Sequence, residues 1–118
     1  MKTVIITGTS AGIGYKLSQI FSDKKFKVIS LSRSPNITQI ASKNIEHISF
    51  DITSDVDHQK FINYCKRNKI EIDILINNAG LLINKTFNDI TVEDFRKIYD
   101  VNLFGVVKLI KNLFEFFS

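Results

Sequence analysis

Short apolar runs alternate along the chain with longer stretches in which apolar residues recur every three or four positions. Short runs bounded by turn residues are typical of buried strands, and the wider spacing is typical of helices with one apolar face. The runs predict strands at residues 2–7, 26–31, 46–50 and 73–77. The spacing predicts helices at 13–24, 37–41, 56–68 and 91–117, the last bent near Asn102.

This alternation of strands and helices predicts an α/β fold with one parallel sheet and right-handed crossovers. We expect a doubly wound sheet of the Rossmann type with the strand order 3-2-1-4. The winding reverses between strands one and four, and ligands of such sheets bind in the crevice at that point, outside the carboxyl ends of the strands. The run at 73–77 is apolar enough to be buried on both faces.

Two predicted helices begin with residues that suit a helix N-terminus. Ser54 or Asp55 is a candidate N-cap for the helix at 56–68. Thr91 and Asp94 have the spacing of a capping box, in which each side chain bonds the backbone N–H of the other residue. Both patterns support the predicted helix starts.

The composition is that of one globular domain of 118 residues, 44% hydrophobic and 24% charged, with a net charge of +4. Basic clusters at 24–27 and 66–69 fall where helices are expected to end, which suits the helix dipole. We interpret them as solvated surfaces and not as a nucleic-acid site, because no aromatic stacking platform accompanies them. The mild basicity also suits a polyanionic cofactor.

The sequence contains no indication of a metal site, a disulfide or a membrane segment. Cys65 is the single cysteine and falls in a helical pattern, so we expect a buried thiol. His47 and His58 have no Cys or His companions at ligand spacing. The chain begins with a strand and not a signal peptide, and its apolar stretches are too short to span a bilayer. We therefore expect a cytoplasmic protein without membrane or nucleic-acid partners.

A glycine-rich stretch from Thr7 to Gly14 joins the first predicted strand to the first predicted helix. Gly8 lets the chain leave the strand tightly, Gly12 lets the backbone approach a pyrophosphate, and Gly14 lets the helix pack close to the strand. A helix N-terminus at this place offers free N–H groups and a positive dipole end to phosphate. The alternative is an ordinary strand–turn–helix corner that uses glycines for steric reasons alone.

Two motifs carry a resemblance to the short-chain dehydrogenase/reductase family. Residues 7–14 match the cofactor loop of that family, TGxxxGIG, and residues 77–80 match its NNAG motif letter for letter. The resemblance covers the whole chain but only the first half of the family's pattern. It implies a single NAD(P)-binding Rossmann domain over 1–118, without strand five and the later elements of the family's domain. It also implies cofactor contacts from Gly8, Ser10, Gly12, Ile13, Gly14, Asn78, Ala79 and Gly80.

Three further positions take their roles from the resemblance. In the family, an Asp at the place of Asp51 accepts a hydrogen bond from the adenine amino group, and the next residue, here Ile52, packs on the ring. The alternative is that Asp51 only caps a turn. Asn102 matches an Asn that interrupts a helix and holds, through its carbonyl, a water leading to the catalytic lysine. It is the only catalytic position of the family in this chain, and an ordinary polar helix residue is the alternative.

The end of the second strand predicts a preference for NADP(H) over NAD(H). An acid there would bond both ribose hydroxyls of NAD and repel a 2′-phosphate. Ser32 is uncharged, and Arg33 can bind a phosphate through two parallel hydrogen bonds. Ala11 stands where a second basic residue is frequent in the family's NADP-binding loops. The alternative is that Arg33 is a solvated turn residue.

The resemblance also indicates what this chain does not contain. The family's proton transfer uses a Ser and a Tyr-x-x-x-Lys, and no tyrosine here has a lysine four positions later: Tyr15 is followed by Gln19, Tyr64 by Asn68 and Tyr99 by Leu103. We expect the chain alone to be catalytically incomplete. It is then the cofactor half of an oxidoreductase, a non-catalytic nucleotide-binding or oligomerisation module, or a truncated product without function.

The last predicted helix is apolar over half of its circumference or more, which is wider than one sheet face requires. In the family this helix packs on the sheet and on a second subunit. Strand four would also be an exposed apolar edge if strand five is absent. We expect a homo-oligomer formed through the helix at 103–117 or through the edge of strand four.

Overall fold

A computed structural model describes residues 1–34 and 44–118, so the short helix expected at 37–41 lies outside the described residues. Four parallel strands form one sheet in the order β3-β2-β1-β4, which confirms the predicted order. Ile5 of the central strand β1 pairs with Ile29 of β2 and with Leu75 of β4. The strands are β1 (Thr3–Thr7), β2 (Lys27–Ser32), β3 (Ile45–Ser49) and β4 (Ile74–Ile76).

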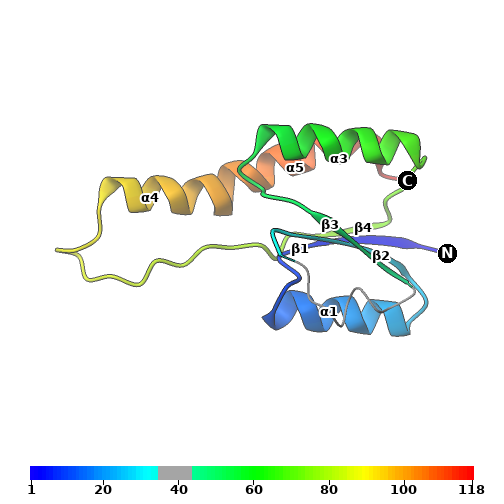
Figure 1. The fold of residues 1–118 in the computed structure, drawn as a ribbon, viewed down its shortest axis with the longest axis horizontal. Coiled ribbons are helices and arrows are strands. Elements are labelled where there is room, and N and C mark those ends of the chain that lie inside the picture. The colour runs from blue at the N-terminus through cyan, green and yellow to red at the C-terminus, as the bar shows by residue number, and fades with distance from the viewer. Residues whose placement is uncertain (35–43) are drawn as a thin grey trace.

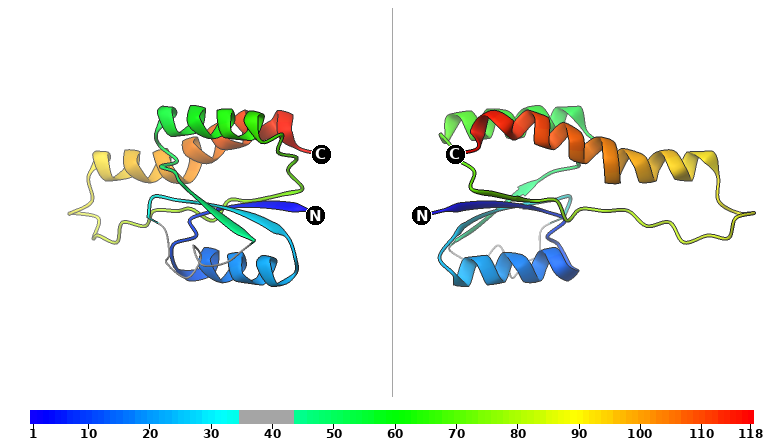
Figure 2. Two further views of the ribbon diagram at one scale, coloured as in Figure 1. Left: turned by 45° about the vertical axis from the view of Figure 1, so that its right-hand side comes forward. Right: turned by 180° about the vertical axis from the view of Figure 1, so that it is seen from behind.

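Helices cover both faces of the sheet, as the doubly wound arrangement requires. Helix α1 (Gly12–Asp23) lies on one face, and α3 (Asp55–Arg67) and α5 (Val106–Leu113) lie on the other (Figure 1). Figure 2 shows the same three layers from two further directions. The sequence prediction of a Rossmann-type α/β fold is therefore confirmed.

Alternate residues of each strand supply two apolar clusters, one on each face, because successive side chains of a strand point to opposite sides. Ile5 and Ile29 face α3 and α5, where Phe61, Cys65 and Leu109 are also buried. Val4, Ile6, Val28 and Ile45 face α1. Cys65 is fully buried, as expected, and burial raises the pKa of its thiol to about 12.

Both predicted helix starts are confirmed by hydrogen bonds. The hydroxyl of Ser54, and not Asp55, caps α3 by accepting from the backbone N–H of Asp57 at 3.2 Å. Thr91 and Asp94 form the reciprocal capping box at the start of α4 (Val92–Tyr99).

The last helical stretch is not the single α-helix that the spacing predicted. Helix α4 passes into a π-helix (Asp100–Gly105), which leads into α5 and then a 3₁₀ turn (Phe114–Phe116). The expected interruption at Asn102 is thus a widened helical segment, a feature that is frequent at functional sites. Helix α4 and the connection that precedes it extend beyond the end of the sheet (Figure 1).

Strand β4 lies at an edge of the sheet formed by the described residues, which confirms its predicted edge position, but the expectation that it is buried on both faces is wrong. Its three residues are only half-buried because β4 is an edge strand of the sheet formed by the described residues. The chain segment just before β4 is nevertheless paired with the C-terminal residues. Ile72 forms a parallel bridge with Phe117, in which the N–H of Ile72 donates to Phe116 at 2.8 Å and that of Ser118 donates to Ile72 at 3.1 Å.

None of the helices within residues 1–34 and 44–118 combines the length and hydrophobicity needed to cross a lipid bilayer. The same residues contain no cluster of three or more His, Cys, Asp or Glu side chains that could hold a metal ion.

Candidate functional site

The glycine turn packs against the end of β4. Gly8 has a φ of +69°, and a Cβ on it would lie 2.8 Å from the Cα of Ala79. A Cβ on Gly14 would collide with the carbonyl oxygen of Gly8 and with Nδ2 of Asn78. Both positions therefore require glycine for steric reasons, as expected for a tight exit from β1 and a close approach of α1.

Gly12 differs from these two because the space that a Cβ on it would occupy is open. Its φ is +62°, and a Cβ on it would meet no atom of the described residues within 4 Å. Helix α1 begins here after the extended residue Ala11, which makes no side-chain capping bond. Its first turn thus offers backbone N–H groups at the positive end of the helix dipole, an arrangement that suits an anion.

Thr7 joins the ends of the neighbouring strands β1 and β4. Its hydroxyl oxygen accepts hydrogen bonds from the backbone N–H groups of Asn78 (3.0 Å) and Ala79 (2.9 Å). The side-chain amide of Asn78 donates in return to the carbonyl oxygen of Gly8 at 2.9 Å. These three bonds fix the glycine-rich stretch at residues 7–14 against the NNAG motif at residues 77–80, at the switch point of the sheet.

A cleft of about 590 Å³ opens at this place, outside the carboxyl ends of the strands. Most of the sequence-predicted site residues line it: Gly8, Ser10, Arg33, Asp51, Ile52, Asn78, Ala79 and Gly80. The remaining four are not in its lining. Gly12 and Ile13 are exposed beside it, Gly14 is buried beneath the turn, and Asn102 bonds the chain after β4.

The end of β2 places Arg33 on the cleft wall. Arg33 is exposed, and the hydroxyl of the preceding Ser32 donates to the carbonyl of Ser34 at 2.7 Å. The positive charge of the guanidinium contributes to lowering the pKa of the Asp51 carboxyl group, which lines the same cleft. A cation at this place can meet an anionic group on a ligand.

Asp51 shapes the corner that follows β3. Its Oδ1 accepts from the N–H of Thr53 at 2.9 Å and from the hydroxyl of Thr53 at 2.7 Å, and these bonds are the main reason that its pKa is lowered. Asp51 therefore does cap a turn, which was one of the two alternatives. The other alternative remains compatible with it, because Asp51 and Ile52 both line the cleft.

Asn102 holds the segment that follows β4. Its Oδ1 accepts from the N–H of Leu81 at 2.7 Å, and its Nδ2 donates to the carbonyl of Leu81 at 2.9 Å. The Asn102 side chain thus satisfies the backbone N–H and carbonyl of Leu81, as a neighbouring strand would. These bonds join the π-helix to the rim of the cleft.

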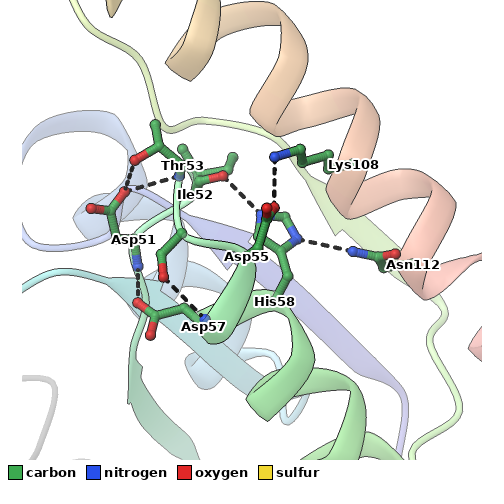
Figure 3. Close-up of polar contacts among 9 residues, drawn as sticks. Asp51, Ile52, Thr53, Asp55, Asp57, His58, Lys108 and Asn112 are labelled. Atoms are coloured by element: carbon green, nitrogen blue, oxygen red, sulfur yellow. Dashed lines mark hydrogen bonds and ion pairs between the residues drawn. The ribbon is translucent and has the colours of Figure 1, made fainter.

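Sequence reasoning missed two groups of residues around the cleft. Lys97, Asp100 and Val101 line it from α4 and the π-helix. Their spacing of three to four positions places them on one helix face, which the sequence could have indicated. The second group lies behind the Asp51 corner, where His58 of α3 and Asn112 of α5 meet (Figure 3). Only the folded chain brings these two together.

Known proteins resemble this chain over almost its whole length. The family profile described as short chain dehydrogenase matches residues 2–118. An uncharacterized oxidoreductase of Schizosaccharomyces pombe is 31% identical over 109 residues, which are 92% of this chain and 37% of that protein. An NADP-dependent (R)-specific alcohol dehydrogenase of Lentilactobacillus kefiri is 28% identical over 111 residues, 89% of this chain and 44% of that protein.

Solved structures agree with the profile. A short chain dehydrogenase of Leptospira borgpetersenii, crystallised with bound NAD⁺, is 34% identical and superimposes with a TM-score of 0.89 over 97% of this chain and 45% of that one. The chain therefore spans less than half the length of these relatives. With the profile matched from its second residue to its last, and with both motifs joined at one cleft, the chain belongs to the short-chain dehydrogenase family.

Proposed function

We propose that this chain is the NADP(H)-binding part of a short-chain dehydrogenase/reductase that acts on carbonyl or alcohol substrates. The observation that carries the proposal is the meeting of three features at or beside one cleft: the start of α1 after Ala11, which makes no side-chain capping bond, the open space next to Gly12 and the cation of Arg33. Members of this family bind an NAD(P) dinucleotide, and the cleft has the chemistry to accept one.

Each part of the dinucleotide has candidate partners in the chain. The first-turn N–H groups of α1, with Ser10 and Ile13, would hold the pyrophosphate, because they join a positive dipole end to backbone donors. Asp51 and Ile52 would bind the adenine, and the segment 78–80 would lie along the nicotinamide ribose. The bound nicotinamide supplies or accepts a hydride, and the protein orients it.

The preference for NADP(H) rests on Arg33 and on the uncharged Ser32 before it. The relatives do not decide this point, because one is described as NADP-dependent and another was crystallised with NAD⁺. A hydrogen bond to a charged group contributes about 1.5–3 kcal/mol, so losing the guanidinium is expected to weaken NADPH binding by roughly tenfold to a hundredfold.

The test is calorimetric titration of NADPH and NADH into the protein and into Arg33→Ala. Arg33→Ala should weaken NADPH and leave NADH nearly unchanged. Arg67→Ala is the matched control, because it removes the same charge from the exposed last turn of α3, which does not line the cleft. Equal losses for the two cofactors, or equal losses in the two variants, would refute the 2′-phosphate assignment.

The chain alone is expected to bind the cofactor without turning over a substrate. None of its tyrosines belongs to a Tyr-x-x-x-Lys, and Asn102 is the one position that the family's catalytic set shares with it. Tyr64 is also unsuited to act as a general acid, because burial and the 2.6 Å hydrogen bond that its hydroxyl donates to Glu46 raise its pKa. Measurable reduction of any carbonyl in a substrate panel would contradict this expectation.

Self-association is a second proposed property. The outer surface of α5 and the turn after it is apolar and exposed: Val107 is 45% exposed, Ile110 40% and Phe114 75%. An apolar surface of this kind favours an oligomer, either through the helix at 103–117 or through the edge of β4. A non-catalytic nucleotide-binding or oligomerisation module would share this surface. The cytoplasmic location expected from the sequence stays a prediction.

A further inference from the structure

A buried histidine connects the Asp51 corner to two helices. His58 lies in the first turn of α3, is only 4% exposed and packs against Phe50 with ring centroids 4.9 Å apart. Its Nε2 is 2.8 Å from the carbonyl oxygen of Ile52, and its Nδ1 is 3.2 Å from Nδ2 of Asn112 (Figure 3). The carbonyl can only accept, so Nε2 carries a proton and donates; Nδ1 then accepts from the amide of Asn112.

The same corner is held from α5 by a second contact. Lys108 forms an ion pair with Asp55 at 2.7 Å, one turn before Asn112 on α5 (Figure 3). Gly105, at the end of the π-helix, approaches so closely that a Cβ on it would lie 2.9 Å from Cγ1 of Ile52. The position of α5 is thus set against the residue that would face the base.

We propose that His58 and Asn112 form a positioning pair that fixes Ile52 and the Asp51 carboxylate for adenine recognition, and so ties the adenine end of the cleft to α5. This inference rests on the proposed function, because the base is the group that the corner would receive. Neither residue lines the cleft, so the pair acts through Ile52 and not by touching the ligand.

The first experiment needs no ligand. Amide hydrogen exchange is followed by NMR at Thr53 and Ser54, whose N–H groups bond Asp51 within the corner. His58→Leu leaves the carbonyl of Ile52 without its donor, so both amides should exchange about tenfold faster, while the amides of β1 do not change. His58→Gln retains a donor of similar reach and should restore protection. Asn112→Leu keeps the histidine and should give a partial effect.

The second experiment titrates AMP, the adenosine half of the cofactor, into the same proteins. His58→Leu should bind AMP about tenfold more weakly, and His58→Gln should bind it nearly as the parent protein does. Cys65→Ala is the control, because Cys65 is buried in the same helix, seven residues after His58, and does not line the cleft. A loss of AMP affinity in Cys65→Ala equal to that in His58→Leu would overturn the inference.

The two experiments separate this inference from the proposed function. Unchanged exchange at Thr53 and Ser54 in His58→Leu overturns the positioning role even if the dinucleotide binds. If the parent protein binds neither AMP nor NADPH, the proposed function fails, and the proposed role of His58 and Asn112 in adenine recognition fails with it, whatever the exchange rates. Faster exchange together with weaker AMP binding, both restored in His58→Gln, supports it.

Discussion

Two substitutions in the glycine turn separate its structural role from its proposed role in binding. A Cβ on Gly14 would collide with the carbonyl oxygen of Gly8 and with Nδ2 of Asn78. These two atoms are already hydrogen-bonded to each other at 2.9 Å, so an alanine at 14 must push α1 away or break that bond. A Cβ on Gly12 would meet nothing within 4 Å in the described part of the chain. An alanine at 12 therefore enters space that we assign to the pyrophosphate.

The two changes should differ in their effect on stability. Overpacking at a rigid contact costs about 1–3 kcal/mol, and loss of a hydrogen bond adds about 1 kcal/mol, so Gly14→Ala should lower the unfolding free energy by about 3 kcal/mol. Gly12→Ala only forces an alanine to a left-handed φ, which costs about 1–2 kcal/mol. At about 5 °C per kcal/mol for a domain of this size, these losses correspond to decreases in Tm of about 15 °C for Gly14→Ala and about 5–10 °C for Gly12→Ala.

The assay combines thermal unfolding followed by circular dichroism with NADPH titration well below the Tm of each variant. Gly12→Ala should keep most of its stability and lose NADPH affinity by at least about tenfold, since a methyl group occupies the approach to the α1 amides. Gly14→Ala should show the larger loss of Tm. A Gly14→Ala variant as stable as the parent would refute the packing argument, and a Gly12→Ala variant with parental affinity would refute the pyrophosphate assignment.

Two further predictions concern stability against pH and self-association. The ion pair with Lys85 and the N–H of Thr91 lower the pKa of Asp94, so its contribution to stability is present above the unfolded pKa of about 3.9 and is lost as pH falls through the folded value. The difference in Tm between the parent and Asp94→Asn should therefore shrink from about pH 6 to about pH 3, and a constant difference would contradict it. Ile110→Lys should shift the protein towards monomers in sedimentation velocity, and the control Val56→Lys, at an exposed position of α3, should not. Identical sedimentation profiles for the parent protein and both variants would contradict the proposed interface.

The strand–turn–helix unit at the glycine-rich stretch could be predicted because its sequence pattern is local. Val4 to Gly14 contains the strand, the exit and the helix start in one continuous stretch, so each residue's environment follows from its neighbours along the chain. The NNAG motif could be placed beside this turn for a similar reason, since both follow strands of one parallel sheet. The capping box at Thr91 is likewise a short-range pattern.

Other parts of the site depend on contacts between distant residues and could not be predicted. His58 meets Asn112 across 54 positions, and nothing near either residue indicates the other. The π-helix has no period that differs visibly from that of an α-helix over six residues. The burial of β4 was misjudged because apolar composition reports what a strand could bury and not which neighbours it has.

Much of the cleft wall is held by hydrogen bonds within the chain itself. Thr7 and Asn78 close the gap between β1 and β4 with bonds that belong to the chain itself, and Asn102 fixes Leu81 at the rim in the same way. The ligand then needs to order few groups, because the walls are already held by hydrogen bonds of 2.7–3.0 Å. Dinucleotide affinity in this chain should therefore follow the contacts that the ligand makes, at Arg33 above all, and depend little on rearrangement of the sheet.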